Sequence, residues 1–238
     1  MYMENVSKNG VRALVASGII LASASSHAAI TCISPPALLN PLVYSGKCPG
    51  ESGFPIPIKA RGRDVSVTLP SNKICSRSMT ITDARNITVT GGHFVYNYAT
   101  PAVITIKNTS GTTFMDGLYI DVNKKYADGI RVYNHKGRLI VQNSLFKGVS
   151  GTRYGVHGDI VHAQDGGPLQ ELTLQNVTGY TGYQGLFTPY RPGSGHGTRK
   201  LTLHRVNVAY DPTVSKKSLK LLYIGSADNS TDRVPDLG

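Results

Sequence analysis

A dense run of polar side chains lies a little past the middle of the chain. It reads Arg153-Tyr154-Gly155-Val156-His157-Gly158-Asp159-Ile160-Val161-His162-Ala163-Gln164. A carboxylate such as Asp159 can orient a neighbouring histidine that accepts a proton, so His157 is the candidate base. An arginine can hold a carboxylate through two parallel hydrogen bonds, which makes Arg131 and Arg153 candidates for binding an acidic substrate. These residue types predict proton transfer beside a bound carboxylate.

Further polar residues occur at matching positions of the neighbouring repeats. An apolar series runs through Ile130, Ile160 and Leu186. If these residues align on adjacent strands, about 4.8 Å apart, the side chains beside them meet on one surface, and Arg131, Asp159 and Gln184 become neighbours. We therefore predict a catalytic set of His157, Asp159 and Arg131. The predicted substrate-binding set is Arg153, Tyr183, Gln184, Arg191 and His162.

Strand parity leaves two interpretations of His162. On an uninterrupted strand His157 and Asp159 share one face, whereas His162 and Gln164 share the other. If Ile160 points inward, His162 also points inward and is a hydrogen-bonded core residue. A bulge or a break at Gly158 would bring His162 to the same surface as the candidate base.

Short alternating strands, repeated along the chain, must position these residues. Copies of the motif are Ile87-Thr88-Val89-Thr90-Gly91, Thr112-Thr113-Phe114-Met115-Asp116, Leu139-Ile140-Val141-Gln142-Asn143, Leu172-Thr173-Leu174-Gln175-Asn176 and Leu201-Thr202-Leu203-His204-Arg205. Their spacing of roughly 25 to 35 residues is typical of solenoids and too short for propeller blades of about 40 residues or more. We predict an all-β, right-handed parallel β-helix (solenoid) of about six to seven coils over residues 64–238.

Small or amide residues end each copy of the motif, in the column Gly91, Asp116, Asn143 and Asn176. Such residues tolerate left-handed turns. We expect them to form a corner of the coil, with asparagine side chains bonded from one coil to the next.

The N-terminal part of the chain differs in composition. Residues 1–28 combine a basic start, a short apolar run and small residues before Ala28, which predicts a secretory signal peptide. Residues 29–63 are rich in proline and glycine and predict an irregular N-terminal cap. Among the three cysteines, Cys32–Cys48 is the preferred disulfide, with pairings to Cys75 left open.

The chain carries a formal net charge of +11, which favours acidic partners. Export argues against nucleic acid and for an acidic polysaccharide. The apolar run at the start is too short to span a bilayer, which needs about 20 residues, so we expect no stable membrane insertion after cleavage. The expected protein is a secreted or periplasmic monomer.

The segment His157-Gly158-Asp159, followed one coil later by Gln184-Gly185-Leu186-Phe187, resembles exported bacterial right-handed parallel β-helix proteins of the pectate-lyase-like superfamily. In that pattern a glutamine stands where this chain has His162. The resemblance implies a polysaccharide lyase, a glycoside hydrolase or a protein that only binds glycans.

Lyase-type β-elimination on an acidic polysaccharide fits the residues best. Hydrolysis would need a pair of carboxylates on one face, which the sequence does not indicate. The alternative is a non-catalytic glycan-binding or cell-envelope β-helix. We predict no cofactor and no metal site; calcium, which needs several oxygen ligands, stays open because aspartates are present but scattered (Asp116, Asp121, Asp128, Asp159 and Asp165).

Overall fold

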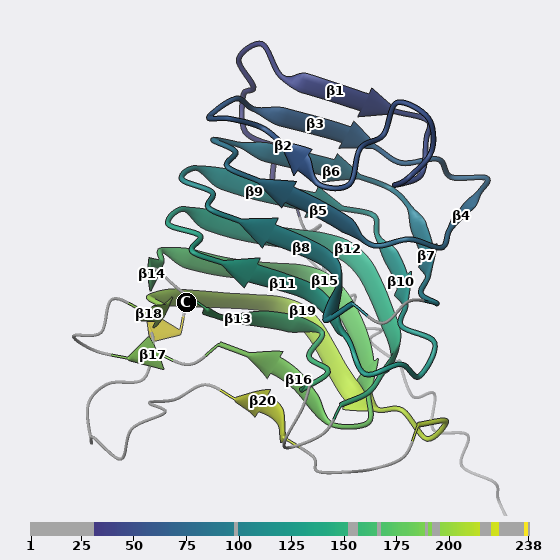
Figure 1. The fold of residues 1–238 in the computed structure, drawn as a ribbon. Helices are drawn as coiled ribbons and strands as arrows, with labels where there is room; N and C mark the ends of the chain where they lie inside the picture. The colour runs from purple at the N-terminus through teal and green to yellow at the C-terminus, as the bar shows by residue number, and fades with distance from the viewer. Residues whose placement is uncertain are drawn as a thin grey trace, which may run out of the picture. The chain divides into compact units, whose positions relative to one another are not determined.

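The computed structural model describes residues 31–97, 100–151, 157–165, 168–188, 190–191, 196–214, 220–223 and 236–237. Residues 33–238 belong to one compact unit. The described residues contain strands and turns but no helix, and the strands stack as a parallel β-solenoid of about six turns (Figure 1). This confirms the all-β solenoid predicted from the repeats.

Two large sheets run along the stack, with parallel pairing between their strands. The larger sheet contains β1 (Leu42–Ser45), β3 (Val65–Thr68), β4 (Ile74–Cys75), β6 (Ile87–Thr90), β7 (His93–Val95), β9 (Thr112–Asp116), β10 (Tyr119–Asp121), β12 (Arg138–Val149), β15 (Glu171–Thr181), β19 (Lys200–Tyr210) and β21 (Asp236–Leu237). The second sheet contains β2 (Ile58–Lys59), β5 (Met79–Thr82), β8 (Ala102–Lys107), β11 (Asp128–Tyr133), β13 (Val161–Asp165), β16 (Gln184–Phe187) and β20 (Lys220–Tyr223). A small third sheet contains β14 (Pro168–Leu169), β17 (Tyr190–Arg191) and β18 (His196–Thr198).

The long strand β12 shows how one coil is built. Its first half pairs with β9 and its second half with β10, so it continues two rows of shorter strands. The strand bends between them at Asn143, which has a φ of 50°. Each coil therefore has two strands in the larger sheet and one in the second sheet, with side chains of all three facing a common core.

Alternating apolar residues fill that core. In the second sheet Met79, Ile104, Ile130, Val161 and Leu186 form one inward column, and all are buried. Burying each such side chain stabilises the fold by about 1.5–3 kcal/mol. On each strand, the residues next to the column member face outward. The column therefore determines which side chains of the second sheet reach the surface.

The predicted turn residues form the corner of the coil, except that Gly117 takes the corner position where we expected Asp116. Gly91, Gly117, Asn143, Asn176 and Arg205 all have positive φ. Asp116, which we expected in this column, precedes the corner instead. Its carboxylate accepts a hydrogen bond of 2.9 Å from Asn143 Nδ2, and Asn143 Oδ1 accepts one of 2.9 Å from Asn176 Nδ2. The expected bonding of amide side chains from coil to coil is confirmed.

Replacing Asn143 should separate the two contributions of this corner. We expect Asn143→Ala to lower the free energy of unfolding by about 2 kcal/mol, because alanine loses both hydrogen bonds and is strained at positive φ. Asn143→Gly should cost about 1 kcal/mol, since glycine loses only the hydrogen bonds. Urea denaturation of both variants measures the difference; equal losses would contradict a strained left-handed corner.

The N-terminal segment is more regular than predicted. Strand β1 pairs with β3, and β2 pairs with β5, so residues 42–45 and 58–59 extend the two large sheets. The segment is therefore part of the solenoid stack and not an irregular cap throughout.

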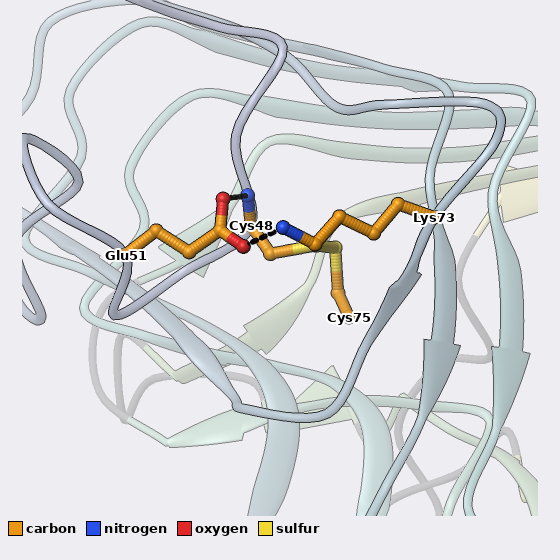
Figure 2. The surroundings of a disulfide bond; sticks show 4 residues. All are labelled: Cys48, Glu51, Lys73 and Cys75. Atoms are coloured by element: carbon orange, nitrogen blue, oxygen red, sulfur yellow. Dashed lines mark hydrogen bonds and ion pairs between the residues drawn. A yellow bond between two sulfur atoms is a disulfide. The ribbon is translucent and has the colours of Figure 1, made fainter.

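A disulfide joins this segment to the next coil. Cys48 and Cys75 are bonded, with their Cα atoms 5.2 Å apart, so the preferred Cys32–Cys48 pairing is wrong. Figure 2 shows Glu51 beside the disulfide, where its carboxylate accepts hydrogen bonds from the Cys48 backbone N–H and from Lys73 Nζ. The disulfide and these bonds fix the loop after β1 against β4.

The predicted signal peptide lies outside the described residues. In the part of the chain that is described, we find no helix that could cross a bilayer.

Candidate functional site

The register of the second sheet decides which polar residues meet. Strands β11, β13 and β16 lie side by side (Figure 1). Ile130 pairs with Val161, and Val161 with Leu186, so the predicted place of Ile160 in this column is wrong by one residue. Arg131 pairs with His162 accordingly. The outer face therefore brings Arg131 next to His162, not next to Asp159.

A left-handed turn at Gly158 causes this shift. Gly158 has a φ of 69°, and a Cβ atom there would lie 2.1 Å from the carbonyl oxygen of Ser150. Only glycine fits such a position. The turn breaks the alternation, so both Ile160 and Val161 are buried while His162 lies on the face opposite Val161. Of the two interpretations of His162, the register supports the one in which a break in the strand places it opposite the inward column, where it is nevertheless almost fully buried.

An aspartate from each of two coils contacts His162. Its Nδ1 lies 2.8 Å from Asp159 Oδ2 and 3.5 Å from Asp128 Oδ2. Asp128 Oδ1 accepts a hydrogen bond of 2.8 Å from the Asp159 backbone N–H, and its Oδ2 lies 3.4 Å from Arg131 Nη1. These contacts form one ionic cluster. We call Asp128, Arg131, His157, Asp159 and His162 the histidine cluster.

Burial changes the protonation chemistry of Asp128. Enclosure away from water, followed by the neighbouring charge of Asp159, raises the pKa of Asp128 to about 7, against the lowering effects of His162, the Asp159 backbone N–H and Arg131. Near neutral pH this carboxyl group can therefore carry a proton, whereas an exposed aspartate would be ionised.

The histidine cluster is open to solvent only in part. Asp128 and Asp159 are fully enclosed, and His162 is 3% exposed. His157 is half-buried, and the Arg131 side chain is 18% exposed. Solvent reaches His157 and Arg131 but not Asp159, whose carboxylate lies against the His162 ring. The sequence indicated no pair of carboxylates; Asp128 and Asp159 form one, but neither is accessible for hydrolysis.

Aromatic rings surround His157. Its ring centre lies 6.1 Å from that of His162, 6.0 Å from Tyr183 and 5.5 Å from Phe187. Phe187 also packs 5.2 Å from the His162 ring. Tyr183, predicted to bind substrate, is buried beside the candidate base. These rings hold the two imidazoles in place.

The remaining predicted site residues do not join the cluster within the described residues. Gln184 is buried on the same strand face as Leu186, which points into the core. Its Oε1 has no hydrogen-bond partner among the described atoms. Arg153 lies outside the described residues, and for Arg191 only the backbone, in β17, is described.

Sequence reasoning missed Asp128 as a member of the site, although a signal was present. Asp128 stands three residues before Arg131, and Asp159 stands three residues before His162. Once Arg131 and His162 are paired, the two aspartates fall at the same position of adjacent coils. The repeated Asp-x-x-Arg/His spacing is the pattern that could have revealed them.

Three members of the cluster also have the geometry of metal ligands. His157, Asp159 and His162 each offer one ligand atom, and these atoms lie within 4.8 Å of one another. Asp121 of the scattered aspartates lies elsewhere, in an ion pair of 3.2 Å with Lys147. Calcium requires several oxygen ligands, whereas two of these three ligands are imidazoles, so the cluster does not suit calcium.

A polar cavity lies away from the histidine cluster, at the ends of β10, β12 and β15. It has a volume of about 310 Å³ and is lined by Asp121, Asn123, Lys124, Lys147, Gly148, Tyr180, Asp211 and Thr213. The Asp211 carboxylate accepts hydrogen bonds from the Gly148 and Thr213 backbones. Because no histidine is among the described residues that line this cavity, it is a weaker candidate for proton transfer than the histidine cluster.

Comparisons of the chain with protein-family models, curated proteins and solved structures give no match. The chemistry of the site is therefore the basis for proposing a function.

Proposed function

We propose that the protein is an exported β-solenoid that cleaves an acidic polysaccharide by β-elimination, with His157 as base and Arg131 holding the substrate carboxylate. The observation that carries this proposal is the pairing of Arg131 with His162 on adjacent coils, beside His157. Both partly accessible members of the histidine cluster, Arg131 and His157, are therefore neighbours of His162. In this proposal His157 is the proton acceptor and Arg131 binds the carboxylate. The proposal agrees with the resemblance to pectate-lyase-like β-helix proteins.

The chemistry needs both groups together. Arg131 neutralises the uronate carboxylate, which makes the adjacent C5–H more acidic. His157 accepts the C5 proton, the electron pair forms the C4–C5 double bond, and the bond from C4 to the glycosidic oxygen breaks. Tyr183, whose ring lies beside His157, is the candidate donor of a proton to the leaving oxygen.

The face of the second sheet next to the cluster suits an acidic sugar chain. Lys107 pairs with Tyr133 on adjacent strands, and its Nζ lies 5.0 Å from the centre of the Tyr133 ring. Arg131 lies 4.9 Å from the same ring. Cations beside an aromatic platform favour a polymer with carboxylates and flat sugar faces.

This same feature supports the second candidate function, a non-catalytic glycan-binding protein. Tyr133, Lys107 and Arg131 could bind a polymer without any reaction. Burial of both aspartates also favours binding, because no acidic group of the cluster reaches a substrate. The two functions differ only in whether His157 removes a proton.

An ultraviolet absorbance assay separates them. The full chain is incubated with alginate, pectate and glycosaminoglycans, and with neutral dextran as the control. β-Elimination creates an unsaturated uronate, so absorbance should rise on at least one acidic polymer and not on dextran. No rise on any polymer, together with salt-sensitive retention on an acidic one, would replace the lyase by the binding function. Neither rise nor retention would refute both.

A further inference from the structure

We propose that His157, Asp159 and His162 form a binding site for one divalent transition-metal ion of the Zn²⁺ type. The site lies where β13 begins, on the outer face of the second sheet. Binding of the ion does not depend on the polysaccharide function proposed above.

The distances suit a small ion. Zinc bonds to nitrogen and oxygen are about 2.0–2.2 Å long, which places neighbouring ligand atoms of a tetrahedral site roughly 3.3 Å apart. In the protein one ligand atom of each residue lies within 4.8 Å of the other two, and His162 Nδ1 lies 2.8 Å from Asp159 Oδ2. Small side-chain rotations can therefore bring all three onto one ion.

The kinds of ligand determine the kind of ion. Two imidazoles and one carboxylate suit zinc, copper, nickel and iron, whereas calcium and magnesium prefer shells of oxygen. The cluster contains only two carboxylates, and Arg131 already lies 3.4 Å from one of them, Asp128. Asp159 is the carboxylate that groups with the two histidines as a ligand.

The surroundings hold the ligands in place. Asp128 Oδ1 accepts a hydrogen bond from the Asp159 backbone N–H and so holds the segment that carries this ligand. Such carboxylates behind metal ligands orient them and strengthen binding. Gly158 fixes the turn between His157 and Asp159, where its backbone packs against Ser150. Since His157 is half-buried, one side of the site stays open for entry of the ion and for a fourth ligand.

Metal binding would compete with proton abstraction if the proposed lyase activity is correct. An imidazole nitrogen bound to a metal ion cannot accept a proton. Elimination would then belong to the metal-free protein, and zinc would inhibit it. This consequence alone depends on the proposed function; the ion affinity is measured without substrate.

Calorimetric titration tests the site directly. Untagged full-length protein is treated with a chelator, dialysed and titrated with Zn²⁺, and Co²⁺ is added to a second sample to record its visible spectrum. We expect one ion per chain with a Kd of about 1 μM or lower. The Co²⁺ spectrum should show the intense bands of a four-coordinate site, and millimolar Ca²⁺ should not displace zinc. Absence of stoichiometric Zn²⁺ binding, or displacement by Ca²⁺, would overturn the proposal.

Variants assign the ligands. His157→Ala, at a half-buried position where folding should survive, should weaken Zn²⁺ binding by about 100-fold or more, and Asp159→Asn similarly. Asp128→Asn should weaken it by about 10-fold. The control His204→Ala removes an exposed histidine on β19 and should leave the affinity unchanged. Wild-type affinity in folded His157→Ala, or an equal loss in His204→Ala, would refute this site.

Discussion

The His157→Ala variant should cleave its polymer about 10²–10⁴ times more slowly than the wild-type protein does, because the variant lacks the proposed base. The loss should fall on kcat. Arg131 and the Tyr133 platform remain in place and still bind the acidic chain, so retention on immobilised polymer should change little. Initial rates of ultraviolet absorbance, measured on metal-free protein, give the effect.

His204→Ala is the matched control for this experiment, since it removes an exposed histidine from the larger sheet. It should keep the wild-type rate. A His157→Ala variant with undiminished rate would remove His157 from the mechanism. Equal losses of rate and of retention would show that the residue only helps to bind the polymer.

The fold could be predicted because its causes are local and repeated. Alternating residues such as Ile87 and Val89 are buried at every coil, and residues that tolerate positive φ recur at the corners. Each coil repeats the same period, so errors at one coil do not propagate. The N-terminal strands β1 and β2 escaped prediction because prolines and glycines around them hide a short alternation.

The sequence indicated which residues the candidate site would contain, but it did not give the register of the strands that carry them. Ile160 and Val161 are both apolar and both buried, so the sequence alone cannot tell which of them continues the inward column. The left-handed turn at Gly158 decides it. That turn depends on packing against Ser150 from the preceding coil, a contact between residues that no local pattern records.

Enclosure was the other property hidden from the sequence. Asp159 is a polar residue in a polar run, and its complete burial depends on neighbours from other coils. The prediction of the disulfide pairing was wrong for a similar reason. Cys48 lies closer in sequence to Cys32 than to Cys75, yet strand β4 brings Cys75 within bonding distance after a full coil.

Asp64→Asn should lower the free energy of unfolding at pH 7 by about 3 kcal/mol. Asp64 is fully enclosed, and its carboxylate accepts hydrogen bonds from Arg85 Nε at 2.8 Å and Nη2 at 2.6 Å. It also accepts the backbone N–H groups of Leu39, at 2.5 Å, and Asn86, at 3.1 Å. In asparagine an NH2 group replaces one of the two acceptor oxygens, and this group faces N–H groups that also donate. The segment before β1 therefore loses hydrogen bonds that attach it to the next coil. Urea denaturation measures the loss.

Asp83→Asn is the control, because Asp83 is exposed in the neighbouring turn and asparagine can still accept its hydrogen bond from Asn108 Nδ2. It should leave the free energy of unfolding close to that of the wild-type protein. A similar loss of stability in both variants would mean that the enclosed hydrogen bonds of Asp64 stabilise the fold no more than an exposed one does.

The effect of Asp64→Asn should shrink in acid. Hydrogen bonds from Arg85, helped by the backbone N–H groups of Leu39 and Asn86, hold the pKa of Asp64 well below its usual range. An unfolded aspartate titrates near a pKa of about 3.9, so below that pH the unfolded chain takes up a proton that the folded chain does not. The stability from this ionised group is complete above about pH 5 and is lost as the pH falls toward the folded pKa. The difference between wild type and Asp64→Asn should therefore narrow between about pH 5 and pH 2. A difference that stays constant over this range would mean that packing, and not the ionised carboxylate, attaches the first coil to the stack.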